Sequence, residues 1–145
     1  MRGGDSGGQQ RRLVLVVEDD PVLQRLMAKH LETANFEVVV ALDYEQAVRQ
    51  LGVQKPSLAC IDLELPRESG YELCEYIRKQ PELVYVPIMV TSERGYPEDM
   101  ANAEEAGANA FLKKPFTMAK LLKYVHAVLD GPHSSRPSVR RLRLS

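Results

Sequence analysis

Five short apolar runs alternate along the chain with longer segments whose apolar residues recur at helical spacing. Runs of this length predict strands buried on both faces. They cover residues 13–17, 36–40, 58–62, 87–91 and 110–112. Such alternation is typical of a parallel sheet with helices packed on both sides. We therefore expect an α/β fold of five βα units in three layers, a (βα)5 arrangement.

The helices between these strands have recognisable start and stop signals. They begin at or just after Pro21, Asp43, Gly70, Pro97 and Thr117. Proline at a first helical position and Asp or Thr as an N-cap are common helix starts. We expect Gly52, Pro81 and Gly131 to end the second, third and fifth helices.

Composition limits the classes of function. The chain has 145 residues, 44% hydrophobic and 27% charged, with a net charge of -1. These values predict one globular domain. The pattern of strands and helices occupies residues 12–130, with a flexible tail expected at 1–11 and a basic flexible tail or linker at 131–145. Near-neutral charge and the lack of a long apolar run do not favour nucleic acid or membrane as the partner of the domain itself. Cys60 and Cys74 lie in apolar patterns, as expected for core residues of a reduced, cytoplasmic protein.

Acidic residues follow two of the predicted strands. Glu18 and Asp19 come directly after the first strand, and Asp62 ends the third. Carboxyl ends of parallel strands meet at one edge of a sheet, where open α/β folds bind ligands. Clustered carboxylates repel one another unless one is protonated or a cation lies between them, and oxygen ligands favour Mg²⁺. The alternative is that these acids are helix caps and solvated loop residues. It suits Asp20, which precedes a proline, better than Asp62, which no helix follows directly.

Two further polar residues, Thr91 and Lys114, stand at the ends of the fourth and fifth strands. Alternation along a strand points Lys113 to the opposite face, so we favour Lys114. Four stretches carry a resemblance: residues 15–21, 62–66 with Gly70, 87–92, and 114–117. In this order on a βα pattern, the chain resembles the CheY-like receiver domain of two-component response regulators over residues 12 to 130. The resemblance implies a doubly wound, flavodoxin-like sheet with strand order 2-1-3-4-5.

The resemblance also implies a role for each matching residue. Asp62 corresponds to the phosphoacceptor aspartate, Asp19 to a direct Mg²⁺ ligand, Glu18 to a ligand through water, Glu64 to a ligand through its main-chain carbonyl, Thr91 and Lys114 to the groups that contact the phosphoryl oxygens, and Phe111 to the aromatic switch. For Phe111, an ordinary place in the core is an equally serious interpretation. Glu64 and Glu93 are acids at positions that flank the phosphoryl group, so we expect a more negative mouth.

As a receiver, the domain is expected to take a phosphoryl group from a sensor histidine kinase or phosphotransfer protein onto Asp62 with Mg²⁺. It would catalyse only its own phosphorylation and dephosphorylation, so it is not otherwise an enzyme. The expected output surface comprises the fourth helix, fifth strand and fifth helix, and its partner is a downstream protein, an output domain or a second copy. We expect Glu104, Glu105, Lys120, Lys123 and Tyr124 to line its exposed side.

Three other interpretations remain open. A degenerate receiver would act as a phosphorylation-independent docking module. A phosphatase of the haloacid-dehalogenase class also phosphorylates an aspartate, and its motif loosely matches Asp62 and Glu64, but the chain leaves no room for a cap domain. A dinucleotide-binding unit is disfavoured because acids replace glycines after the first strand. The arginines at 136, 140, 141 and 143 leave open a nucleic-acid-binding arm, but we favour a solvated linker because no helix-turn-helix or other effector pattern fits there.

Overall fold

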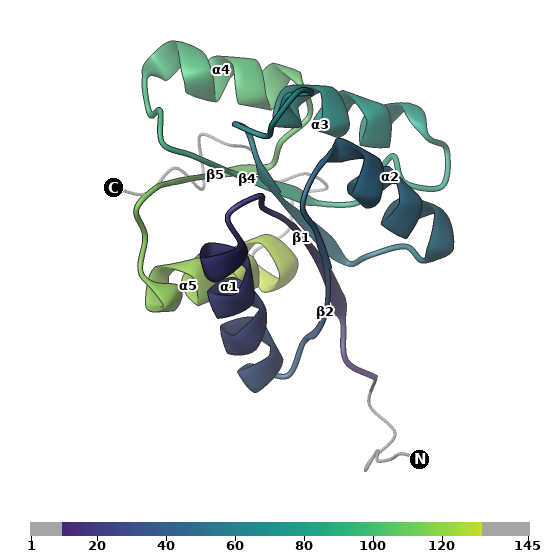
Figure 1. Cartoon of the computed structure of the whole chain (residues 1–145), viewed down its shortest axis with the longest axis vertical. Helices are drawn as coiled ribbons and strands as arrows, with labels where there is room; N and C mark the ends of the chain where they lie inside the picture. Colours follow the sequence, from purple (N-terminus) through teal and green to yellow (C-terminus); the bar gives the residue numbers. More distant parts are fainter. Residues whose placement is uncertain (1–9, 132–145) are drawn as a thin grey trace.

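The computed structural model describes residues 10–131, and the tails expected at 1–11 and 131–145 lie outside the described residues apart from 10, 11 and 131. Five strands alternate with five helices in this part of the chain (Figure 1). In chain order they are β1 (Leu13–Val17), α1 (Pro21–Thr33), β2 (Glu37–Ala41), α2 (Tyr44–Val53), β3 (Leu58–Asp62), α3 (Gly70–Lys79), β4 (Ile88–Ser92), α4 (Pro97–Glu105), β5 (Ala110–Lys113) and α5 (Met118–Asp130). Within this range no helix is both long enough and apolar enough to cross a membrane.

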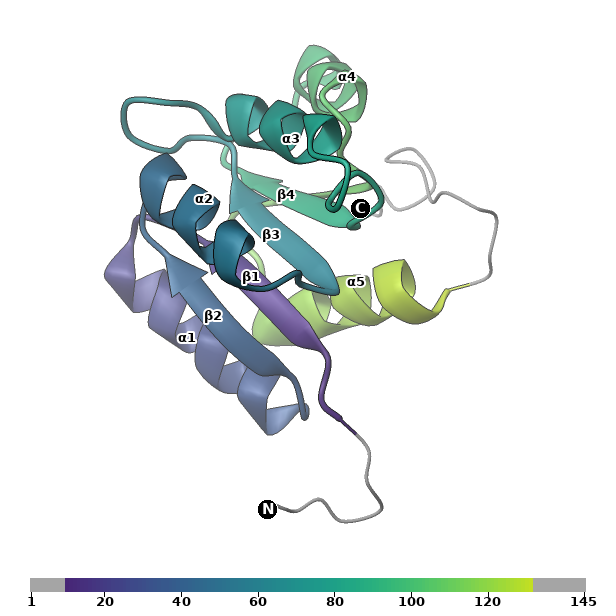
Figure 2. The same cartoon turned by 90° about the vertical axis from the view of Figure 1, so that its right-hand side faces the viewer.

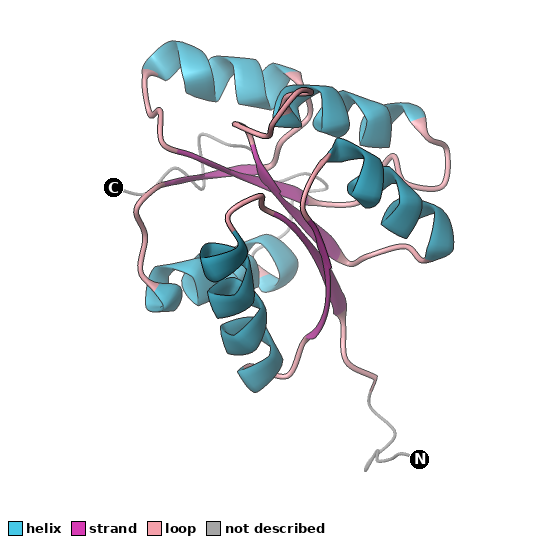
Figure 3. Ribbon diagram, in the orientation of Figure 1, coloured by secondary structure: helices cyan, strands magenta, loops and turns pink. Residues whose placement is uncertain are grey.

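The strands form one parallel sheet in the order β2-β1-β3-β4-β5. Helices α2, α3 and α4 cover one face, and α1 and α5 cover the other (Figures 2 and 3). The three inner strands β1, β3 and β4 are buried throughout, whereas β2 at the edge is mostly half-exposed. This confirms the expected doubly wound α/β fold and its strand order.

Each face of the sheet has its own hydrophobic core. Alternate β3 residues divide between them: Ile61 packs with α2, α3 and α4, and Cys60 packs with α1 and α5. Cys74 of α3 is buried in the first core, so both cysteines are core residues, as expected. All five side chains of β3 are buried. Asp62, the last residue of this strand, is therefore an ionisable group surrounded by apolar residues.

Several element ends differ from the expected ones. Gly52 does not end α2, which continues to Val53. The amide of Gln54 still donates to Gln50 O, and a single glycine in a last turn costs only about 1 kcal/mol relative to alanine. Strand β2 begins one residue late because the Phe36 amide donates to Leu31 O and closes α1 instead.

The amino edge of the sheet is fastened by one side chain. The guanidinium of Arg78, at the end of α3, donates to the carbonyls of Val84 and Val86, which precede β4. It also donates to Gly107 O and to the Asn109 side chain, which precede β5. Gly107 has a φ of 111°, a left-handed conformation that favours glycine. The end of α3 and the α3–β4 and α4–β5 connections are thereby held together on the side of the sheet opposite Asp62.

The expected output surface is present only in part. Glu105 and Lys123 are exposed, and Glu104 and Lys120 are half-buried. Tyr124 was expected on the exposed side, but it is only 1% exposed. It shares the inward stripe of α5 with other core residues, because residues three and four apart lie on the same helix face. The Lys120 ammonium lies 6.0 Å from the centre of its ring.

Candidate functional site

Three carboxylates meet at the carboxyl edge of the central strands. Single oxygens of Glu18, Asp19 and Asp62 all lie within 4.8 Å of one another. Strands β1 and β3 are paired neighbours, with Val17 in register with Ile61, so the acids that end them are necessarily close. Glu18 and Asp62 are 1% and 2% exposed, whereas Asp19 faces solvent. Asp20 is not part of the cluster, since its carboxylate caps α1 by accepting from the Val22 and Leu23 amides.

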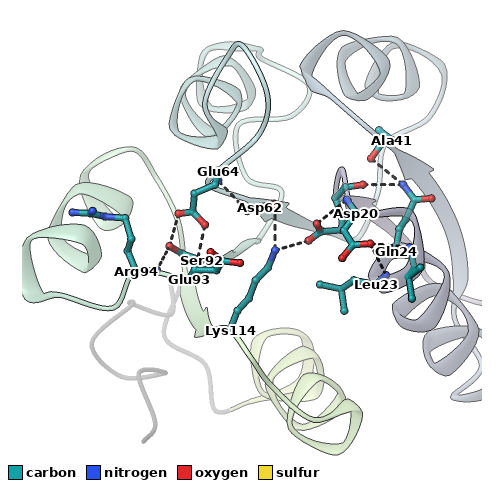
Figure 4. A network of polar contacts seen from close by, with 12 residues as sticks. Asp20, Leu23, Gln24, Ala41, Asp62, Glu64, Ser92, Glu93, Arg94 and Lys114 are labelled. Carbon is teal, nitrogen blue, oxygen red and sulfur yellow. Dashed lines mark hydrogen bonds and ion pairs between the residues drawn. The ribbon is translucent and has the colours of Figure 1, made fainter.

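Lys114 supplies positive charge to this cluster. Its Nζ lies 2.9 Å from Glu18 Oε1 and 3.3 Å from Asp62 Oδ2 (Figure 4). The following peptide bond, to Pro115, is cis. The neighbouring Lys113 is exposed, and its ammonium donates to the Lys114 carbonyl instead. The lysine favoured by strand alternation is therefore the one beside Asp62.

Burial and nearby charge govern the titration of Asp62. Loss of water raises the pKa of Asp62 to about 6, and the Glu18 charge adds to this rise. The Glu64 amide, which donates to Asp62 Oδ1 at 2.9 Å, and the Lys114 ammonium partly oppose it. Burial by itself lowers the pKa of Lys114, but its contacts with Glu18 and Asp62 outweigh burial and the pKa is raised. The site thus holds more negative charge than its one lysine offsets.

The remaining predicted residues occupy two different faces of the sheet. Thr91 is in register with Asp62 on the neighbouring strand and is buried, and neighbours in register point to the same face. Gly70 starts α3 against the Asp62 carbonyl, where an added Cβ would collide with that oxygen. Phe111 is 2% exposed and packs in the opposite core with Val90 and α4. The structure therefore brings Thr91 and Lys114 to Asp62 but places Phe111 on the opposite face of the sheet.

The exposed carboxylate of Glu64 is held by two donors at the end of β4 and the start of the loop after it. Its Oε2 accepts from the Ser92 hydroxyl at 2.6 Å, and its Oε1 accepts from the Glu93 amide at 3.0 Å. The expectation that Glu64 and Glu93 make the mouth more negative stays a prediction. No local feature of the sequence indicates Ser92 as a partner of Glu64, since the two residues are 28 positions apart.

A cleft of about 420 Å³ opens beside the cluster. Its lining consists of Asp20, Leu23, Glu93, Lys114, Pro115 and Phe116. Asp20 and Glu93 make two of its walls acidic, and Leu23 and Phe116 add apolar surface. A group entering this cleft reaches the Lys114 ammonium and, behind it, Asp62.

Comparison with protein families gives a match to the response regulator receiver domain over residues 14–126. The chain belongs to this family. The receiver domain is 32% identical over 118 residues to the phosphate regulon transcriptional regulatory protein PhoB of Escherichia coli (strain K12), an alignment that covers 81% of this chain and 52% of PhoB. The chain spans about half the length of the curated relatives that it matches.

Solved receiver structures have the same fold. The chemotaxis protein CheY4 of Vibrio cholerae superposes with a TM-score of 0.80 at 27% identity, covering 82% of this chain and 99% of that one. The signal receiver domain of a signal transduction histidine kinase from Syntrophus aciditrophicus gives a TM-score of 0.76 at 29% identity, with coverages of 83% and 91%. The chain is therefore a two-component receiver domain.

Proposed function

We propose that this receiver domain accepts a phosphoryl group on Asp62 from a histidine kinase or a phosphotransfer protein. The observation that carries the proposal is the position of Asp62: a buried carboxylate at a strand end, 3.3 Å from the Lys114 ammonium and close to two further acids. Burying an ionised carboxylate costs free energy unless a charge or hydrogen bond compensates for it. A buried acid that lies beside a lysine and a cleft is therefore a functional-site candidate.

The transfer needs few groups beyond those present. A carboxylate oxygen of Asp62 forms a bond to phosphorus while the phosphorus–nitrogen bond of the donor phosphohistidine breaks. The electron pair of that bond returns to the imidazole, which takes up a proton. The Glu64 amide fixes Asp62 Oδ1, and Lys114 offers its charge to the phosphoryl oxygens in a site from which most water is excluded. Positioning and charge account for most of the catalysis expected of such a site.

The acid cluster fits a magnesium ion. All its side-chain donors are oxygens, and its net charge is negative even with Lys114 protonated. Asp19 and Asp62 are the proposed direct ligands together with the Glu64 carbonyl, and Glu18 acts through water. Glu18 suits the indirect role because its carboxylate also accepts from Lys114 and the Asp20 amide. When bound, Mg²⁺ supplies positive charge for the phosphoryl oxygens.

The proposed response spreads from Thr91 to the output surface. We assign to the Thr91 hydroxyl a bond to the phosphoryl group, and to Phe111 a move into the space that Thr91 vacates. Phe111 supports this assignment because it packs beside Val90 and against α4. The α4–β5–α5 surface is then a bistable element biased by local charge. Its partner is a downstream protein, an output domain or a second copy of the chain.

Incubation with acetyl phosphate and Mg²⁺ tests the acceptor residue. The wild-type protein should gain the mass of one phosphoryl group, and hydroxylamine, which cleaves acyl phosphates, should remove it. Asp62→Asn should gain none, whereas the matched control Asp43→Asn, whose carboxylate caps α2 by accepting from the Gln46 amide, should be labelled like the wild type. Equal labelling of wild type and Asp62→Asn would reject Asp62 as the acceptor and favour a docking module.

A further inference from the structure

One side chain links the two loops that border the site. Glu64, in the β3–α3 loop, accepts from the Ser92 hydroxyl at 2.6 Å and from the Glu93 amide at 3.0 Å. The Ser92 oxygen in turn accepts from the Arg94 amide at 2.9 Å. Figure 4 shows these residues beside Asp62, on the side away from Asp20 and Gln24. We call the Glu64–Ser92 contact, with its two amide donors, the loop clasp.

The loop clasp joins a buried hydroxyl to an exposed carboxylate. Ser92 is 1% exposed, whereas Glu64 faces solvent. A hydrogen bond to a charged group is stronger than a neutral one. The two partners of the loop clasp come from loops that follow neighbouring strands, and two of the three donors are backbone amides of consecutive residues. The loop clasp therefore fixes backbone, and with it the course of the chain directly after Thr91.

The same loop continues into the first turn of α4 through a second set of contacts. Arg94 Nε lies 3.2 Å from Asp99 Oδ1, and the Tyr96 amide donates to Asp99 Oδ2 at 3.1 Å. The Asp99 carbonyl accepts from the Tyr71 hydroxyl of α3 at 3.4 Å. Asp99 is buried, so this turn is anchored on the α3 side. A displacement of the β4–α4 loop therefore has to reach α4.

We infer that Glu64 is a positioning residue whose loop clasp holds the β4–α4 loop in its unphosphorylated position, and that release of the clasp accompanies switching. Thr91 and Ser92 are consecutive, and strand alternation places them on opposite faces of the sheet. A backbone movement that brings Thr91 closer to Asp62 therefore also moves Ser92. The loop clasp opposes that movement, so it stabilises one state of a two-state element. The switching part of this inference rests on the proposed function, whereas the restraint on the loop does not.

Amide hydrogen exchange in the unphosphorylated, magnesium-free protein tests the restraint directly. Ser92→Ala should speed exchange of the Arg94 amide by roughly fivefold to tenfold, because its acceptor is lost. Glu64→Ala should do the same for Glu93, whereas Glu64→Gln keeps an acceptor and should restore much of the protection. Glu98→Ala removes an exposed acid from the first turn of α4 and should leave both amides unchanged. Unchanged exchange in Ser92→Ala and Glu64→Ala would overturn the inference.

Chemical shifts test the switching part. Amide signals of residues 93–100 in Glu64→Ala, without any phosphoryl group, should move part of the way towards their positions in wild type bound to beryllofluoride. Glu64→Gln should move them less. Displacement in an unrelated direction would show that the loop clasp is structural only and would overturn its part in switching. Should beryllofluoride leave the wild type unchanged, the proposed function fails, while the exchange measurements still decide whether the loop clasp restrains the loop.

Discussion

The amino and carboxyl edges of the sheet differ in how their charged groups are compensated. At the amino edge, the Arg78 guanidinium donates to main-chain carbonyls at distances between 2.7 and 3.1 Å, so one cation meets several partial negative charges. At the carboxyl edge, three acids gather around Lys114, so negative charge is in excess. At the amino edge, the cation and the carbonyls satisfy one another. At the carboxyl edge, the repulsion between the carboxylates is only partly offset by Lys114.

This difference separates stability from function within one fold. Breaking a partly buried network removes a donor from several carbonyls at once, which destabilises the folded state. Relieving an acid cluster removes repulsion, which stabilises the folded state but also removes the chemistry. Substitutions at the two edges should therefore change stability in opposite directions.

The largest effect is expected at the amino edge. Arg78→Ala should lower the free energy of unfolding by about 2–4 kcal/mol, because several carbonyls lose their donor at once. Arg78→Lys keeps the charge but not the planar fork, so it should recover only part of the loss. Urea denaturation measures both, and labelling by acetyl phosphate per folded molecule should stay at the wild-type level. A stability loss below about 1 kcal/mol would mean that this network matters no more than a surface pair.

The carboxyl edge should respond with the opposite sign. Asp62→Asn should raise the stability of the metal-free protein at pH 7 by about 1 kcal/mol. This is the net effect, because the substitution removes repulsion from the other acids but also removes the contact with Lys114. The pKa of Asp62 is raised to about 6 in the folded state, so its carboxyl group stays protonated to a higher pH there than in the unfolded chain. The wild type therefore loses stability as pH rises from about 4 through 6. Thermal unfolding at several pH values should show the two proteins converging below pH 4 and separating above pH 6.

Much of this comparison was accessible from the sequence, for a physical reason. Strand type and the meeting of Glu18, Asp19 and Asp62 depend on periodicity and on the rule that parallel strands end at one edge. The strand order was implied by the resemblance to receiver domains. Lys114 rather than Lys113 followed from strand alternation alone. The same arguments fail for contacts made by long side chains between distant loops. Nothing local to Arg78 or Ser92 indicates that its partners lie beyond the next turn.

The misplacement of Tyr124 and the contacts of Glu64 mark the two sides of what periodicity can predict. The spacing of Tyr124 from Leu121, Val125 and Val128 puts it on the apolar stripe of α5, so helical periodicity already indicates its burial. The side chain of Glu64 reaches Ser92, 28 positions away, and the Glu93 amide. Such contacts depend on packing in three dimensions, which neither periodicity nor spacing encodes.

A smaller effect concerns the ligands of the acid cluster. Asp19→Asn removes a carboxylate oxygen from the proposed magnesium site and should weaken Mg²⁺ binding on the order of tenfold. Glu64→Gln should weaken it much less, because the proposed ligand there is the main-chain carbonyl. Isothermal titration with MgCl₂ compares the two variants. The reverse order would refute the proposed ligand set and require the Glu64 side chain to leave the loop clasp when the metal binds.

The smallest effect is expected at an exposed ion pair near the amino edge. Both guanidinium nitrogens of Arg12 contact the Asp130 carboxylate at the end of α5, at 2.8 and 3.1 Å. The bond from Arg12 lowers the pKa of Asp130 to about 2. Its contribution to stability is therefore present above the unfolded pKa of about 4 and is lost as pH falls towards 2.

Solvent screens this pair, unlike the groups around Arg78, so Asp130→Asn should cost less than about 1 kcal/mol at pH 7 and less still in 0.5 M salt. Urea denaturation with and without salt measures this, and Arg12→Gln should give the same loss. A cost as large as that of Arg78→Ala would mean that charge pairing alone stabilises this edge. A small, salt-sensitive cost would instead assign the stability of the amino edge to the satisfied carbonyls around Arg78.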